Sequence, residues 1–275
     1  MKRFSRSLAA ALVACIVAVA LAPAMAAGDP ALQWLIDGAQ RSEKNRLRDR
    51  YRHPLETLTF FGLRDDLAVV EILPGTGGYW TEILAPYLKA RGTYYAAGPA
   101  KDTTSAEGQK EITGFAAKLA ADPADYGKVI VTAFAGDQHD IAPPGTADLV
   151  VTFRNVHNWM ASGTADQAFA AFFKALKPGG VLGVEDHRGR TDQPQDPLAK
   201  SGYVREDYAI ALAEKAGFKL LARSEVNANS KDTKDYAVGV WALPPTYRLK
   251  DQDHAKYEAI GESDRFTLTF VKPKS

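Results

Sequence analysis

From residue 67 onward the sequence alternates short apolar runs with amphipathic stretches, and this alternation limits the possible fold of the 275-residue chain more than any other feature. The apolar runs predict strands, and the stretches with apolar residues three or four positions apart predict helices. Strands that alternate with helices form a parallel sheet with helices on both faces. The predicted strands are 67–73, 92–97, 129–134, 147–153, 181–185, 218–224 and 265–271, and the predicted helices are 79–88, 107–121, 165–176 and 205–216.

The last predicted strand has a different pattern. Residues 265–271 alternate phenylalanine or leucine with Thr267 and Thr269, which is typical of an antiparallel strand with two different faces. A long polar, proline-containing excursion over 227–263 precedes it.

The first residues have the organisation of an export signal. Three basic residues precede a charge-free apolar run over 8–21, and Ala24-Met25-Ala26 then provides the small-x-small pattern of a cleavage site. The run is shorter than the roughly 20 apolar residues that a membrane-spanning helix needs. We predict cleavage after Ala26, a periplasmic or secreted location, and no stable membrane insertion after cleavage.

This N-terminus divides the chain into a signal peptide (1–26) and one domain (27–275), made of N-terminal helices (27–62) and an α/β core (63–275). An uncleaved anchor and a lipoprotein attached through Cys15 are the alternatives. Cleavage removes the only cysteine, which suits an oxidising periplasm. Because 34 Lys+Arg face 33 Asp+Glu, bulk charge argues against a nucleic-acid partner.

The N-terminal helices carry a basic run. Residues 31–61 have a helical pattern in which Pro54 opens a second helix. We interpret the run as a solvated helix face balanced by Glu43 and Asp49, with an anion site as the alternative. The run comprises Lys44, Arg46, Arg48, Arg50 and Arg52.

A glycine-rich turn, Leu73-Pro74-Gly75-Thr76-Gly77-Gly78, joins the first strand to the next helix. Ligands of open α/β sheets bind at the carboxyl ends of the strands, where glycines let backbone N–H groups approach them closely. A dinucleotide-binding fingerprint would need a third glycine where Trp80 stands. The turn therefore predicts a ligand site, but not one for NAD.

Glu71 inside the strand, followed by Pro74-Gly75-Thr76-Gly77, resembles the first motif of class I S-adenosylmethionine-dependent methyltransferases. Later segments are similar to further motifs of that family, and their order is similar to an exported bacterial subgroup described as predicted methyltransferases. The resemblance and the element order together imply a Rossmann-like α/β fold: a seven-stranded mixed sheet with the last strand antiparallel, helices on both faces and an N-terminal helical extension. The later segments are Gly136-Asp137, 148–151, 176–182, Gly217-Phe218 and 264–268.

The resemblance also implies S-adenosylmethionine as the cofactor. The residues that it places at the cofactor are Glu71, Pro74, Gly75, Thr76, Gly77, Gly98, Asp137 and Asn155. Two departures bear on this site. Leu73 stands where the family has a glycine, which should narrow the turn, and residues 94–99 lack the acid that holds the ribose, at a cost of about 1–3 kcal/mol of binding.

Methyl transfer needs the acceptor and the methyl carbon aligned, and a general base only when the acceptor is protonated. Residues 154–159 follow the fourth strand, and we predict His157 as the base, with His187 as a second acid or base. Asn158, Trp159 and Tyr203 are the predicted substrate contacts. The alternatives are that His157 caps the strand end, that Trp159 covers the core, and that Tyr203 begins an ordinary helix.

Asp186 beside His187 raises the question of a metal shared with His157, Asp137 or His139, but no H-x-x-x-H spacing supports one, and we predict none.

The leading hypothesis is a methyltransferase acting on a small-molecule or otherwise unknown acceptor. Export would separate the enzyme from a cofactor made in the cytoplasm, so the alternative is a non-catalytic exported binding or scaffold protein that retains the fold. A hydrolase is a third possibility. Because the chain has no G-x-S-x-G motif and no mature cysteine to act as nucleophile, such an enzyme would need a metal-activated water.

Overall fold

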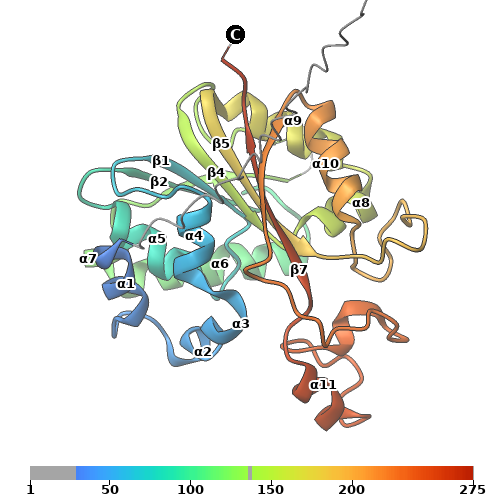
Figure 1. Ribbon diagram of the computed structural model, residues 1–275. Helices are drawn as coiled ribbons and strands as arrows, with labels where there is room; N and C mark the ends of the chain where they lie inside the picture. Colours follow the sequence, from blue (N-terminus) through green and yellow to red (C-terminus); the bar gives the residue numbers. More distant parts are fainter. Residues whose placement is uncertain (1–28, 136–137, 275) are drawn as a thin grey trace, which may run out of the picture.

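The computed structural model describes residues 29–135 and 138–274, so the predicted signal peptide lies outside the described residues. Within them, seven strands form one sheet in the order β3-β2-β1-β4-β5-β7-β6 (Figure 1). Strands β1 to β5 run parallel, and β7 runs antiparallel to both β5 and β6. The predicted fold class is confirmed. The strands are β1 Ala68–Ile72, β2 Thr93–Gly98, β3 Ile130–Ala133, β4 Ala147–Phe153, β5 Leu176–His187, β6 Lys219–Ser224 and β7 Arg265–Val271.

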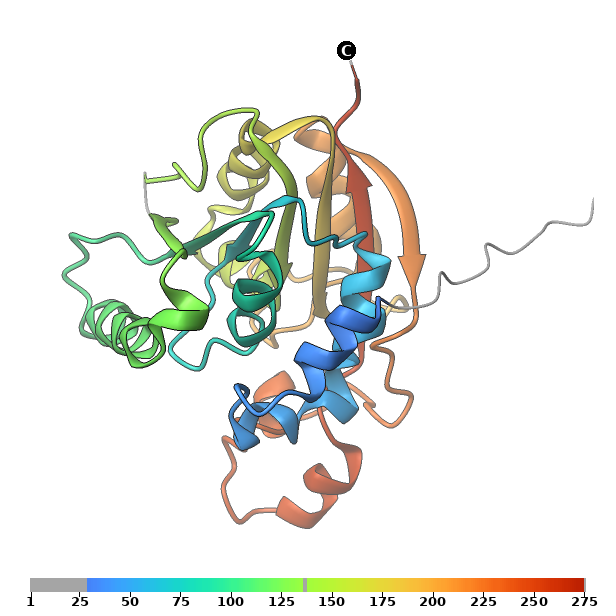
Figure 2. The same cartoon turned by 90° about the vertical axis from the view of Figure 1, so that its left-hand side faces the viewer.

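Helices cover both faces of the sheet (Figure 2). Helices α1, α4, α5 and α6 pack on one face, and α8, α9 and α10 pack on the other. The helices are α1 Pro30–Asp37, α2 Glu43–Arg46, α3 Asp49–Arg52, α4 Pro54–Phe60, α5 Thr81–Leu88, α6 Ala106–Ala121, α7 Pro123–Tyr126, α8 Val156–Ser162, α9 Ala165–Ala175, α10 Glu206–Lys215 and α11 His254–Ile260, with a 3-10 turn, η1, at Gly239–Ala242. None of these helices is long and apolar enough to cross a membrane.

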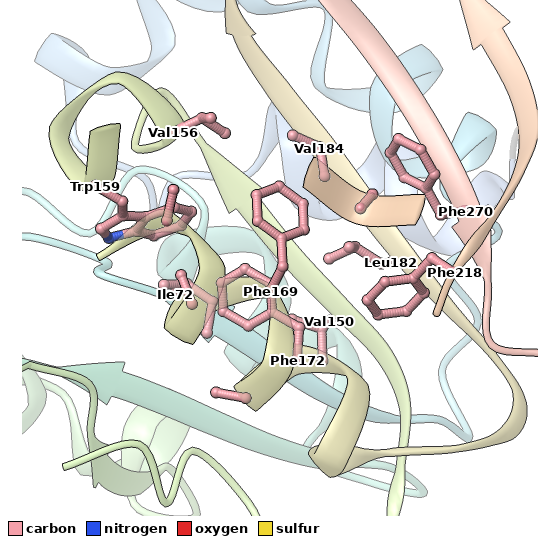
Figure 3. Close-up of a cluster of buried hydrophobic side chains, with 14 of the residues drawn as sticks. Ile72, Val150, Val156, Trp159, Phe169, Phe172, Leu182, Val184, Phe218 and Phe270 are labelled. Carbon is pink, nitrogen blue, oxygen red and sulfur yellow. The ribbon is translucent and has the colours of Figure 1, made fainter. Parts of the chain in front are cut away.

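The larger core cluster lies between the sheet and α9. Phe169 and Phe172 of α9 are fully buried against Val150 and Leu182 of the central strands (Figure 3). Full burial of one such side chain stabilises the fold by about 1.5–3 kcal/mol. This cluster fixes the central strands whose carboxyl ends form one edge of the sheet.

Strand β5 differs from the prediction, whereas β7 agrees with it. Strand β5 begins at Leu176, five residues early, because Leu176 pairs with Ala147 before the ladder shifts register. Strand β7 has the predicted bounds and two different faces: Phe266, Leu268 and Phe270 belong to the α9-side core, whereas Thr267 and Thr269 are buried on the opposite face. The hydroxyl of Thr267 is satisfied by the Asn227 side-chain amide at 3.0 Å.

The C-terminal excursion (residues 227–263) contains two elements that the sequence did not predict, η1 and α11. It lies below the carboxyl edge of the sheet, beside α2 and α3, in both views (Figures 1 and 2). Asn227 fastens its start by donating to Thr57 Oγ1 at 3.0 Å. The excursion and the N-terminal helices therefore flank the edge where a ligand would bind.

Candidate functional site

The turn after β1 lies at the edge of the sheet where β2, β4 and β5 also end. Gly75 has a φ of 65°, a conformation that glycine adopts without steric cost. A side-chain carbon added at Gly75, Gly77 or Gly98 would meet no atom within 4 Å. These three glycines therefore border open space where ligands bind in sheets of this kind.

Leu73 does not narrow the turn as predicted. Its φ of 52° lies in the left-handed region that favours glycine, at a cost of about 1–3 kcal/mol. Its side chain packs against the α9-side core, and its N–H donates to Ala97 O at 2.8 Å. The leucine thus adopts the conformation of a glycine and leaves the space above the turn free.

A cavity of about 490 Å³ opens beside this turn, within the usual range for small-molecule sites. It lies between the ends of β1 and β2 on one side and α6 on the other. Its lining is mostly apolar and is made of Pro74, Gly75, Gly98, Pro99, Lys101, Glu111, Ile112, Phe115, Ala116, Leu119 and Val131. Of the predicted cofactor residues, Pro74, Gly75 and Gly98 line this cavity.

Glu111 is the acid of this cavity, and sequence analysis missed it. It lies on α6, thirteen positions after Gly98. In the family pattern the acid stands at the end of β2, which is Gly98 here. Burial, and secondarily Glu107, raises the pKa of Glu111 above its ordinary value. An acid that faces the cavity from a helix leaves no mark in the strand-end motif, so only the fold reveals it.

Glu71 supports the turn from inside the protein. Its carboxylate is buried and accepts hydrogen bonds from the hydroxyls of Tyr94 and of Thr81, the latter at 3.1 Å. Burial raises the pKa of Glu71 to about 7, although these hydroxyls act to lower it. The predicted cofactor contact is therefore corrected: Glu71 joins β1 to β2 and to the start of α5, and its carboxylate is not part of the cavity lining.

Asn155 joins the ends of the two central strands. Its side-chain amide donates to Ile72 O at 3.3 Å and to Thr152 Oγ1 at 3.2 Å. Thr76 stands within the turn, and its methyl carbon approaches Gly114 of α6 closely. Asp137, the predicted adenine contact, lies outside the described residues.

His157 and His187 meet at the ends of β4 and β5. The rings lie 5.2 Å apart, centre to centre, and both are buried. His157 Nδ1 lies 3.0 Å from Asp186 Oδ1, and Asp186 also accepts the backbone N–H of His157. This pairing places the proton on Nδ1 and leaves Nε2 as the nitrogen that can accept a proton.

His187 is held in the neutral form. Burial lowers its pKa well below the ordinary value, and the positive charges of Arg154, Arg265 and Arg52 add to the effect of His157. Its Nδ1 contacts Ser263 Oγ at 2.5 Å. The contacts of Asp186 with His157 and of Ser263 with His187 were not predicted, because neither contact follows from sequence spacing.

The predicted substrate contacts do not gather at this edge. Trp159 is buried in the core against Phe134 and Phe172, so its predicted substrate role is wrong and the core alternative holds (Figure 3). Asn158 is exposed on α8. The Tyr203 ring lies 6.4 Å from that of His187, but its hydroxyl is engaged by Asp232 at 2.9 Å.

The C-terminal excursion supplies an aromatic neighbour that sequence analysis missed. The Trp241 ring lies 6.2 Å from that of His157, and the Arg248 guanidinium stacks over Trp241 at 4.4 Å. The excursion thus covers the His157 side of the edge.

The basic run of the N-terminal helices is not a solvated face throughout, which corrects that interpretation. Arg52 is only 3% exposed and lies 4.4 Å from the centre of the Tyr79 ring. Arg48 Nε pairs with Glu262 at 2.6 Å. Both arginines therefore face the inside of the molecule at the carboxyl edge.

His157, Asp186 and His187 are also a group whose ligand atoms lie within 4.8 Å of one another in the part of the chain that the structure describes. Asp186 already accepts three hydrogen bonds, from His157 Nδ1 and the backbone N–H groups of His157 and His187. These bonds, together with the nearby guanidinium groups, disfavour a divalent cation here.

Comparison with solved structures identifies the fold. A S-adenosylmethionine-dependent methyltransferase from Aquifex aeolicus matches with a TM-score of 0.52 at 16% identity, over 88% of this chain and 96% of that one. The chain has the fold of class I methyltransferases. The cyclase SpnF matches equally well, with a TM-score of 0.52 at 15% identity over 87% of this chain and 86% of that one.

Human N-acetylserotonin methyltransferase, solved with S-adenosylmethionine, matches this methyltransferase fold with a TM-score of 0.50 at 12% identity, over 88% of this chain and 56% of that one. No protein-family model matches the sequence, and no curated protein matches it either. The comparisons therefore establish the methyltransferase fold, and the chemistry has to be argued from the site.

Proposed function

We propose that this protein is a S-adenosylmethionine-dependent methyltransferase whose acceptor is a small molecule. The observation that carries the proposal is the open space at Gly75, Gly77 and Gly98 beside a cavity of about 490 Å³, on the edge that also presents His157. The methyltransferase fold of the solved neighbours supports it.

The residues at this edge fit the cofactor. The turn glycines would let backbone N–H groups approach its amino-acid part, and the apolar wall of α6 would cover its base. Glu111 would accept hydrogen bonds from the ribose hydroxyls in place of the acid that β2 lacks. The bound cofactor supplies an electrophilic methyl group.

His157 would serve the acceptor as a general base. Asp186 orients its ring, so that Nε2 can take a proton from an acceptor hydroxyl or amine as the new bond forms. His187, held neutral, would orient the acceptor by a hydrogen bond. Burial at this edge excludes water from the reacting groups.

Transfer of radioactive methyl groups tests this activity. The mature protein, incubated with labelled S-adenosylmethionine and a small-molecule extract, should label at least one compound, and His157→Gln should reduce the rate on the order of 10²-fold. Gln167→Asn, an exposed change on the neighbouring helix α9, should leave the rate unchanged. Labelling that is equal in the His157→Gln variant would remove the histidine from the mechanism, and no labelling by the folded parent would favour a binding protein.

We also propose that the enzyme works outside the cytoplasm after cleavage behind Ala26. The mass of the protein recovered from the periplasmic fraction should correspond to a chain that begins at Ala27. An intact N-terminus in the cytoplasmic fraction would contradict this.

A further inference from the structure

Four guanidinium groups from separate parts of the chain converge at the carboxyl edge, beside the two histidines. Arg48 and Arg52 come from the N-terminal helices, Arg154 follows β4, and Arg265 begins β7. Two buried carboxylates pair with this cluster. Arg265 Nη1 lies 3.1 Å from both Glu185 Oε1 and Glu262 Oε2, and Glu262 also pairs with Arg48 and Arg52.

Arg154 is the one arginine of these four that forms no ion pair with the two carboxylates. Its side chain makes no ion pair or hydrogen bond within the described residues, and its Nε is buried without a partner. Its φ of 60° places it in the left-handed region, where a non-glycine residue is strained. The backbone holds this conformation through Arg154 N–H, which donates to Glu185 O at 2.7 Å. Strain and an unpaired guanidinium at a strand end together indicate a functional position.

The neighbouring arginines also have donors to spare. Arg52 Nη2, Arg48 Nη2 and Arg265 Nε are buried with no hydrogen-bond partner in the described part of the chain. Burial, and then the charge of Arg154, lowers the pKa of Arg52 to about 9. Buried polar groups are nearly always satisfied, and among the described residues these four guanidinium groups face only two carboxylates, those of Glu185 and Glu262. Four unused donors around an excess of positive charge call for an anion.

The cluster adjoins the proposed reaction centre. Arg265 pairs across the strands with His187, and Arg154 is three residues before His157. Arg154, Arg265 and Arg52 are near enough to depress the pKa of His187. An anion bound here would therefore lie beside the proposed base.

We propose that Arg154 and Arg52 bind an oxyanion, carboxylate or phosphate, carried by the methyl acceptor. Guanidinium groups match such oxyanions with paired, charge-assisted hydrogen bonds. The role as acceptor anchor rests on the proposed methyltransferase function, whereas the anion site itself does not. The same positive field argues against a metal ion on the two histidines.

Calorimetric titration of the mature protein with inorganic phosphate and with acetate, at constant ionic strength, tests the site. Arg154→Gln should weaken binding of the preferred anion by about tenfold or more. Arg91→Gln, which removes an exposed arginine paired only with Asp65, should bind like the parent. The anion that binds more tightly, phosphate or acetate, shows which oxyanion the site prefers. Arg154→Lys, which keeps the charge but loses the planar fork, should fall between parent and Arg154→Gln.

Stability and cofactor competition complete the test. Arg154→Gln should melt at the same temperature as the parent or higher, because it relieves repulsion; a large fall would assign Arg154 a structural role and overturn the proposal. Equal anion binding by Arg154→Gln, or no binding by the folded parent, would also overturn it. If saturating S-adenosylhomocysteine abolishes anion binding, the arginines hold the cofactor carboxylate instead of the acceptor. If S-adenosylhomocysteine does not bind while the Arg154-dependent anion does, the anion site stands and the methyltransferase proposal fails.

Discussion

Glu71 shows how one residue can keep the position of a family motif and yet do its work inside the protein. Its carboxylate is held by Tyr94 and Thr81 and never reaches the cavity. Burial raises its pKa to about 7, so near neutral pH a substantial part of the carboxyl groups are protonated. The stability of the fold should therefore depend on pH through this residue.

Glu71→Gln tests that dependence. A carboxyl group whose pKa is raised on folding stabilises the fold fully below its unfolded pKa of about 4.5, and this contribution is lost as the pH rises through about 7. Glutamine does not titrate, so the variant lacks this loss of stability. The difference in free energy of unfolding, variant minus parent, should therefore increase by roughly 3 kcal/mol from about pH 4 to about pH 8.

Urea unfolding followed by tryptophan fluorescence at both pH values measures this difference. Glu214→Gln, an exposed change on α10, should move it by less than about 0.5 kcal/mol. If the free energy of unfolding of Glu71→Gln changes with pH as that of the parent does, the Glu71 carboxyl does not have a raised pKa in the folded protein.

At the scale of elements, the C-terminal excursion and the N-terminal helices are joined by a buried ion cluster. Glu262 accepts from Arg48, Arg52 and Arg265. Burial alone would raise the pKa of Glu262, but Arg52, Arg265 and Arg154 outweigh it and lower the pKa to about 2. Its contribution is therefore present above about pH 4.5 and lost only as the pH falls toward about 2.

Glu262→Gln should loosen this junction. Removal of one partner from a buried ion pair leaves uncompensated charge, and we expect a loss of about 3 kcal/mol in the free energy of unfolding, with faster proteolysis inside residues 227–263. Glu225→Gln, which removes an exposed partner of Arg188, should cost less than about 1 kcal/mol. If the two variants unfold alike, the junction does not hold the excursion in place.

The same elements show what could be read from the sequence. The strands and longer helices were predictable because burial on one or both sides leaves apolar runs with a clear period. The helical turns of the excursion were not predictable, because η1 and α11 are too short to show a period and η1 is held by a contact with a distant residue, Ser201. The bounds of β7 were predictable, whereas the contact between Thr267 and the Asn227 side chain was not, because the two residues are 40 positions apart.

At the scale of the whole molecule, the order of strands brings residues far apart in sequence to one edge. The turn glycines and His157 were predictable, since both follow strands whose carboxyl ends must meet. Arg52, Glu111, Trp241 and Ser263 were not, because they reach the edge from helices and from the excursion, where no local motif marks them. Trp159 stands beside His157 in the sequence but turns into the core, which only the packing decides.

Calorimetric titration of the mature 27–275 protein with S-adenosylmethionine and S-adenosylhomocysteine determines whether the open edge at the glycine-rich turn binds the cofactor. We predict a dissociation constant on the order of micromolar, abolished by Gly77→Asp, which places a carboxylate in open space without backbone strain. Ala170→Asp, which adds the same charge on the exposed face of α9, should bind like the parent, and Glu111→Gln about tenfold more weakly. Absence of binding near millimolar cofactor by a folded protein, or equal binding by Gly77→Asp, would show that this edge is not a cofactor site.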